Sequence, residues 1–242
     1  MTPTQQLQSL LHQTYTTPSG DEYKIELLPG LTNEEINTLA QRLPTKQIPD
    51  DIRDLLLFTR GFEFYGIEEI RFDGIGQFGF ENIFPYSAEL AGDGFGNFWI
   101  LDINAKGQWG NVFYVCHDPA VVVKHSDDLS QFIQHVHEYG SDMENSNMHI
   151  IHEKNAFDIW KNNHGFIEIS EASNSSDTIL KDFAASVPEN FVIADLRNKS
   201  NGSGFAWGRF GPAIDKAVRH NDELLWAVEK KVKKGFFARL FG

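Results

Sequence analysis

The sequence contains a single cysteine, Cys116, and no run of about 18 apolar residues. One cysteine excludes an internal disulfide and a cysteine-rich zinc site, and its apolar neighbours predict a small buried hydrophobic side chain. Without a long apolar run, no segment is expected to span a membrane. The amino terminus lacks the basic and apolar segments of a secretion signal. These absences predict a cytoplasmic protein with no integral membrane contact.

Basic residues are also few, since 21 Lys and Arg stand against 34 Asp and Glu for a formal charge of −13. Residues 229–242 carry a net charge of +4, so residues 1–228 carry −17. An acidic body repels phosphate backbones, which argues against nucleic acid as a ligand and favours a basic protein partner. Negative charge that only maintains solubility is the alternative. The basic, aromatic tail leaves packing, disorder or a weak membrane-surface anchor open.

Hydrophobic periodicity predicts an α+β fold in which a mainly antiparallel sheet packs against helices. The second expected helix begins with a capping box formed by Thr32 and Glu35. Helices are expected over residues 4–14, 32–43, 50–60 and 129–139. Strands are expected over residues 23–28, 67–72, 98–103, 112–116 and 121–124, and the last four follow one another without an intervening helix, which favours antiparallel pairing.

The pattern changes after residue 140. We therefore expect one domain over residues 1–140 and a smaller α+β region of unknown role over residues 141–242. This second region is expected to hold a helix within 142–163, a helix capped near Asp177 and a strand over 191–194. Residues 224–228 fit a helix or a strand, because their periodicity does not separate the two.

Motifs for chemistry are weak. Residues 74–79 match G-x-G-x-x-G, but no βαβ unit surrounds them, so a loop between strands is the better interpretation. The nine histidines form no recognisable ligand set. Asp195, Arg197 and Arg209 could serve an enzyme, although Asp195 and Arg197 are more typical of a structural ion pair. We therefore expect no catalytic residue, no metal and no cofactor.

Four segments occur in a recognisable order. Ile48-Pro49-Asp50-Asp51 opens a leucine-rich helix that ends at Gly61, and residues 93–102 read D-G-F-G-N-F-W-I-L-D. A strand over 110–118 and a helix over 126–139 follow. Together they resemble the SMI1/KNR4 family, also called the SUKH superfamily, over roughly residues 30–140. Arg60 departs from the asparagine that the family pattern places before the glycine.

The resemblance implies an α+β domain without general catalytic residues. Bacterial members of this family are largely immunity proteins that bind and neutralise a toxin, and fungal members regulate cell-wall synthesis through protein contacts. The resemblance therefore predicts a non-enzymatic protein-binding protein, most simply an immunity protein against a basic toxin domain. A regulatory scaffold or adaptor is the alternative.

Two sets of residues follow from this hypothesis. The first is expected to set the fold and consists of Asp93, Gly94, Gly96, Asn97 and Asp102. The second is expected to contact the partner, because acids and aromatics in a loop-rich stretch beside a sheet suit an interface. Its members are Glu63, Tyr65, Glu68, Glu69 and Asp73.

Overall fold

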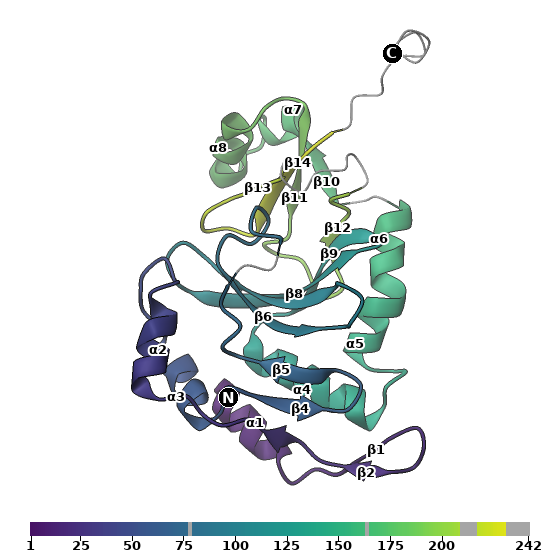
Figure 1. The fold of residues 1–242 in the computed structure, drawn as a ribbon. Helices are drawn as coiled ribbons and strands as arrows, with labels where there is room; N and C mark the ends of the chain where they lie inside the picture. Colours follow the sequence, from purple (N-terminus) through teal and green to yellow (C-terminus); the bar gives the residue numbers. More distant parts are fainter. Residues whose placement is uncertain (77–78, 163–164, 209–216, 231–242) are drawn as a thin grey trace, which may run out of the picture.

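A five-stranded antiparallel sheet lies at the centre of the computed structural model, which describes residues 1–76, 79–162, 165–208 and 217–230 (Figure 1). Its strand order is β12-β9-β8-β7-β6. The bounds are β6 Ser87–Gly92, β7 Phe98–Ile103, β8 Trp109–His117, β9 Ala120–Ser126 and β12 Gly204–Phe205. The sheet separates two layers, so both of its faces are buried.

Alternate residues of the central strands enter different hydrophobic clusters, as the two-residue period of a strand requires. On β7, Leu101 packs with the amino-terminal helices, while Ile100 packs with the carboxyl-terminal strands. On β8, Tyr114 packs in the cluster of the amino-terminal helices, and Phe113 packs in the cluster of the carboxyl-terminal strands. Burial on both faces explains why these strands are almost continuously apolar.

The first face of the central sheet is covered by helices and a second sheet. The helices are α1 Pro3–Leu10, α2 Asn33–Ala40, α3 Asp50–Phe58 and α4 Leu129–Ser141. The second sheet has the order β3-β4-β5, with β3 Glu26–Leu27, β4 Gly61–Phe64 and β5 Glu68–Arg71. A two-stranded hairpin of β1 Tyr15–Thr16 and β2 Glu22–Tyr23 lies beside it.

Helix starts on this face follow the local sequence. Thr32 accepts a hydrogen bond from the amide of Glu35, whose carboxylate accepts one in return from the amide of Thr32, which is the predicted capping box. Asp128 caps α4 through the amide of Gln131. Asp50 and Asp51 occupy the first turn of α3, where negative charge is favourable.

The opposite face is covered by the carboxyl-terminal sheet, whose order is β10-β11-β14-β13. Its strands are β10 Phe166–Glu168, β11 Phe191–Asp195, β13 Ala217–Arg219 and β14 Leu225–Glu229. Trp226 of β14 packs toward the central sheet, while its neighbours Leu225 and Ala227 pack against α7 Ile169–Ala172 and α8 Thr178–Ser186. This arrangement answers the helix-or-strand question for residues 224–228.

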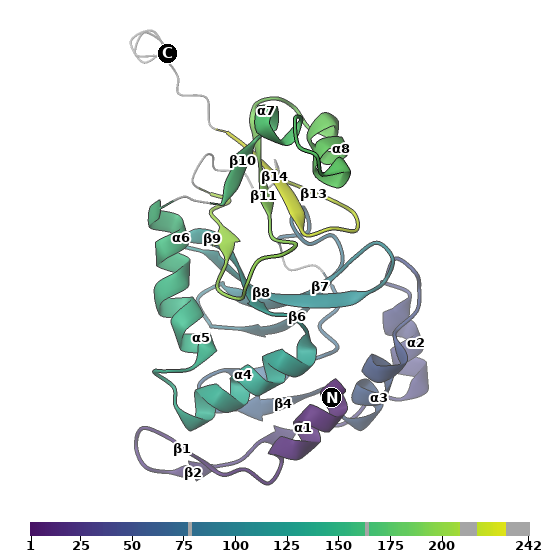
Figure 2. The ribbon, with the colours of Figure 1, turned by 180° about the vertical axis from the view of Figure 1, so that it is seen from behind.

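A helical segment runs along the side of the central sheet (Figure 2). It consists of α5 Asn147–Ile150, the π-helical turn η1 Ile151–Asn155 and α6 Ala156–Asn162. Ile151 and Ile159 join the main core. Thus residues beyond 140 contribute to the first core, and β12 pairs with β9. The boundary at residue 140 stays a prediction.

The predicted fold class is confirmed, since the chain is α+β and its sheets are antiparallel. Strands β4 and β6 had not been predicted, and the strand expected over 23–28 is divided between β2 and β3. No helix in the described ranges is long and apolar enough to cross a membrane. Residues 77–78 of the glycine-rich motif, Arg209 and the tail from residue 231 lie outside the described residues.

Candidate functional site

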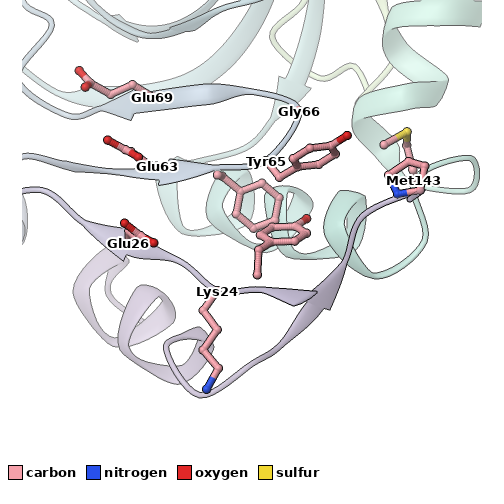
Figure 3. Close-up of a pocket in the computed structure, with 10 residues that line it drawn as sticks. Lys24, Glu26, Glu63, Tyr65, Gly66, Glu69 and Met143 are labelled. Atoms are coloured by element: carbon pink, nitrogen blue, oxygen red, sulfur yellow. The ribbon is translucent and has the colours of Figure 1, made fainter. Parts of the chain in front are cut away.

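An open hollow of about 800 Å³ lies over the β3-β4-β5 sheet. Three strands, the segment before β3 and the start of the α4–α5 connection contribute to its lining. Figure 3 shows Glu69, Glu63 and Glu26 one below the other on the three strands. The residues that line the hollow are Pro18, Tyr23, Lys24, Glu26, Glu63, Phe64, Tyr65, Gly66, Glu69 and Met143.

Strand register creates the acidic row that consists of Glu26, Glu63 and Glu69. Glu63 lies directly opposite Glu26 on one side and Glu69 on the other. Side chains at such positions lie about 5 Å apart at their Cβ atoms, and like charges there destabilise the sheet. All three are exposed. In the described part of the chain, Glu26 and Glu63 take part in no ion pair, so two charges of the row remain available.

Aromatic rings adjoin the acidic row. Tyr65 is 48% exposed, and its ring centroid lies 5.4 Å from that of Tyr23. Tyr23 in turn packs edge-on against Phe64 at 5.4 Å. Burial, with contributions from Tyr139 and Tyr65, raises the pKa of Tyr23 to about 12, so its hydroxyl stays neutral. The ring of Tyr65 packs against Tyr23 and is still partly open to solvent, so it is suited to anchor a protein partner.

The predicted partner-binding residues are only partly brought together. Glu63, Tyr65 and Glu69 line one hollow. Asp73 does not line it. Both carboxylate oxygens of Asp73 accept hydrogen bonds from Arg71, at 2.8 and 2.7 Å. Glu68 is the first residue of β5, and its side chain lies outside the described part of the structure. Glu63 lies on β4 rather than in the expected loop.

Sequence reasoning did not find several residues of this hollow, and Glu26 is the most important. The predicted strand over 23–28 was the available signal, because it placed Glu26 on a strand. The pairing of that strand with β4 joins residues 26 and 63, and local patterns do not encode it. Lys24 and Met143 were also missed, because only the folded chain brings them to this hollow.

The motif at residues 93–97 forms a closed turn. One oxygen of Asp93 accepts from the amides of Phe95 and Asn97, and the other accepts from the side chains of Asn97 and Tyr114. Burial raises the pKa of the Asp93 carboxyl, but these hydrogen bonds outweigh it and hold the pKa below its ordinary value. Gly94 and Gly96 adopt φ angles of 77° and 85°. The fold-setting role of these residues stays a prediction.

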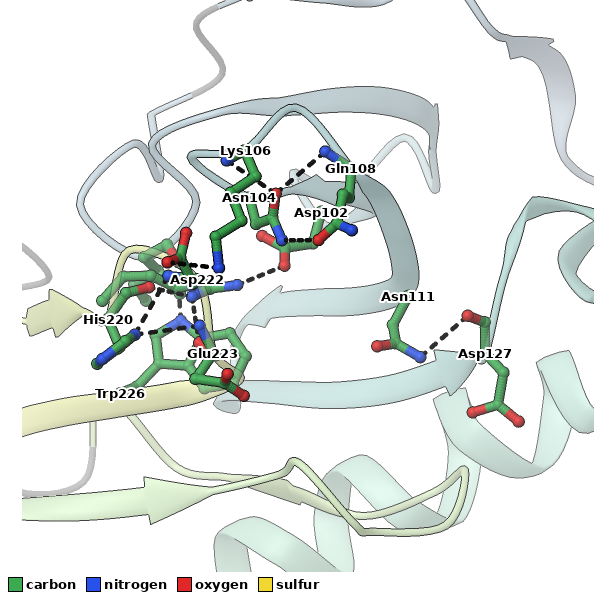
Figure 4. A network of polar contacts seen from close by, with 12 residues as sticks. Asp102, Asn104, Lys106, Gln108, Asn111, Asp127, His220, Asp222, Glu223 and Trp226 are labelled. Atoms are coloured by element: carbon green, nitrogen blue, oxygen red, sulfur yellow. Dashed lines mark hydrogen bonds and ion pairs between the residues drawn. The ribbon is translucent and has the colours of Figure 1, made fainter. Parts of the chain in front are cut away.

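Asp102, at the end of the same motif, joins two distant parts of the chain. Its carboxylate is 2.5 Å from Nη2 of Arg219 on β13, and both side chains are at most 5% exposed. Nη1 of Arg219 donates to the carbonyls of His220 and Glu223, and the guanidinium lies 4.8 Å from the ring centre of Trp226. Figure 4 shows Asp102 facing the segment that carries His220 and Glu223. Asp102 therefore connects the central and carboxyl-terminal sheets.

The histidines of the core contact each other through ring packing. His125 and His135 lie in the core with ring centroids 4.9 Å apart. Burial and the neighbouring His135 hold the pKa of His125 well below its ordinary value, so it is neutral at pH 7. Across the described ranges, no group of three His, Cys, Asp or Glu side chains could hold a metal ion.

The possible enzymatic residues of the second region form an ion-pair network. Nη2 of Arg197 lies 2.6 Å from carboxylate oxygens of both Asp177 and Asp195. Asp177 also caps α8 through the amides of Ile179 and Leu180. These contacts fix the start of α8 against the end of β11, which is the structural role that the sequence favoured.

Comparison with known proteins gives one match. Residues 30–135 match the model of the SMI1 / KNR4 family (SUKH-1), which confirms the resemblance found in the sequence. The matched segment runs from the residues before α2 into α4, a little under half of the chain, and contains the acidic residues Glu63 and Glu69. No curated protein and no solved structure matches the chain significantly.

Proposed function

Since residues 30–135 match the SMI1/KNR4 family, we propose that this chain is a non-enzymatic cytoplasmic protein that binds another protein. Its specific role is that of an immunity protein, which neutralises a bacterial toxin by direct contact. The observation that carries the proposal is the acidic row beside the exposed ring of Tyr65. Nearest-neighbour repulsion in this row costs stability, and binding of a basic surface would offset that cost.

The chemistry of the row favours a partner rich in Lys and Arg. A total charge of −13 attracts such a partner over distance and raises the association rate. At the surface, the carboxylates of Glu26 and Glu63 accept hydrogen bonds from ammonium or guanidinium groups. Tyr65, now 48% exposed, supplies an aromatic side chain that becomes buried on binding, and such contacts usually dominate binding energy. The toxin is inactivated because the bound protein occludes its active surface.

Co-expression with a candidate toxin, such as one encoded by a neighbouring gene, tests the role. The full chain is expected to restore growth to toxin-producing cells and to elute with the toxin as one complex on a sizing column. Unchanged toxicity together with separate elution would refute the proposal for that toxin.

Pull-down from the native cell separates this function from the scaffold alternative. A single, genetically linked toxin in the captured material supports the immunity role. Several unrelated housekeeping proteins, captured without any toxin, would instead support a regulatory scaffold or adaptor.

A further inference from the structure

A second hollow of about 320 Å³ adjoins the first, because Gly66 and Met143 line both. It lies between the turn after β4, the turn that precedes β7 and the segment of α5 and η1. The two hollows form one continuous surface, so a partner seated on the acidic row would reach the second hollow. Its remaining lining residues are Ile67, Asp93, Phe95, Trp99, Tyr139, Met148, His149, His152 and Glu153.

The walls of the second hollow are mainly aromatic and sulfur-containing. Trp99 is 6% exposed and forms part of the wall, whereas Phe95 is 80% exposed at the tip of the turn. Ile67, Tyr139, Met143 and Met148 also belong to this apolar lining. Aromatic ring faces attract cations, and methionine side chains adapt to long flexible occupants.

The charge of the second hollow is negative. Asp93 and Glu153 line it, and its described lining includes neither Lys nor Arg. His152 lies between these acids, with Nε2 3.7 Å from Asp93 and Nδ1 2.8 Å from Glu153. The Asp93 carboxylate already accepts four hydrogen bonds, three from its own turn and one from Tyr114 of β8, so Asp93 acts through its charge. Glu153 is 53% exposed and has an oxygen left to accept a hydrogen bond.

We propose that the second hollow binds one arginine side chain of the partner protein. The planar guanidinium stacks on the aromatic rings and donates to Glu153, and the aliphatic stem packs on the methionines. An arginine fits better than a purely apolar side chain, because an uncharged occupant would desolvate the exposed carboxylate of Glu153 and leave the charge of Asp93 without a cation. This inference rests on the proposed function, in which the partner is basic.

The test is an NMR titration of the ¹⁵N-labelled full chain with N-acetyl-arginine amide and, in parallel, N-acetyl-leucine amide. The arginine probe is expected to bind at least fivefold more tightly. Its shifts should concentrate on the amides of residues 93–99 and 148–153 and on the indole of Trp99. Equal or tighter binding of the leucine probe, or shifts that spread evenly over the acidic surface, would overturn the proposal.

Two exposed variants sharpen the test. Phe95→Ala and Glu153→Gln are each expected to weaken the arginine probe at least threefold, whereas Phe157→Ala should leave it unchanged. Phe157 is a matched control, because it is 54% exposed on α6 and does not line the hollow. Unchanged binding in both Phe95→Ala and Glu153→Gln would refute the arginine site.

The same variants separate this inference from the proposed function. If toxin binding is weakened by Glu63→Lys but not by Phe95→Ala or Glu153→Gln, the arginine site is wrong and the proposed function stands. If the arginine probe binds as expected but no toxin is neutralised, the immunity role fails instead.

Discussion

Glu63 and Asp102 both lie on antiparallel strands, but one faces water beside two other glutamates and the other faces an arginine in the core. Burial raises the pKa of the Asp102 carboxyl, and Arg219 opposes that shift. Loss of one partner there would leave an uncompensated charge. In the acidic row, by contrast, removal of a charge relieves repulsion. The surroundings of an acidic side chain therefore decide whether it stabilises the fold or serves a partner.

The largest effect is expected for Arg219→Ala. This change leaves Asp102 buried without its guanidinium, so the free energy of unfolding should fall by about 3–5 kcal/mol. Urea denaturation measures the loss. Lys106→Ala is the matched control, since Lys106 pairs with Asp222 at the surface, and it should change stability by no more than about 1 kcal/mol.

A double change completes this comparison. Asp102→Leu combined with Arg219→Met removes both charges and should restore much of the stability that Arg219→Ala loses. Equal stability of the Arg219 and Lys106 variants would show that burial does not distinguish the two ion pairs.

Reversal of the acidic row should affect binding rather than folding. Glu26→Lys, Glu63→Lys and Glu69→Lys in one chain should weaken toxin binding by about 100-fold, which corresponds to about 2.7 kcal/mol. Calorimetry gives the affinity, and denaturation gives the stability. A control with the same change in net charge combines Glu171→Lys, Asp182→Lys and Glu189→Lys in the carboxyl-terminal part. If both triple variants lose affinity equally, only total charge matters.

Acid stability depends on the buried histidines. Burial lowers the pKa of both His125 and His135, so the folded state keeps them neutral while the unfolded chain binds protons near pH 6.5. The contribution of the neutral His125 and His135 rings to the free energy of unfolding is fully present above about pH 6.5. It falls as pH drops below this value, by up to about 1.4 kcal/mol per pH unit for each histidine.

Denaturation at several pH values tests this dependence. His125→Leu is expected to flatten the decline below pH 6.5, whereas His12→Gln, at an exposed site, should leave the profile unchanged. A profile that is identical in His125→Leu and in the original chain would contradict the assignment.

The smallest effect is expected for Glu63→Gln. Removal of the middle charge relieves two repulsive pairs, so stability should rise by roughly 0.5 kcal/mol. The gain should disappear in 1 M NaCl, where the Debye length is about 3 Å. Thermal unfolding at low and high salt measures both values. A loss of stability at low salt would mean that Glu63 supports the sheet.

Local signals in the sequence predicted the elements whose determinants are local. The capping box of Thr32 and Glu35 located α2, and Asp128 located the start of α4. Strand β6 was missed because Ser87, Ala88, Ala91 and Gly92 have little preference for strands. Strand β14 was ambiguous because both of its faces are buried, which removes the alternation that identifies a strand.

Contacts between distant residues could not be predicted. Asp102 was expected to set the fold, but its partner Arg219 lies 117 positions away. The acidic row likewise depends on the pairing of β3 with β4, which brings Glu26 opposite Glu63. Asp73 was chosen for its charge, and only the geometry of Arg71 reveals that its oxygens are occupied.

The short strand β12 has a consequence for any shortened form of this molecule. Gly204 and Phe205 pair with Val123 and Val122, so β12 covers the edge of the central sheet that β9 would otherwise form. A fragment that stopped at residue 140 would lack β12, so the backbone amides and carbonyls of this edge at Val122 and Val123 would lose their partners. Exposed edge strands can pair with strands of other molecules and so cause aggregation. In the full chain, β12 covers this edge of the central sheet.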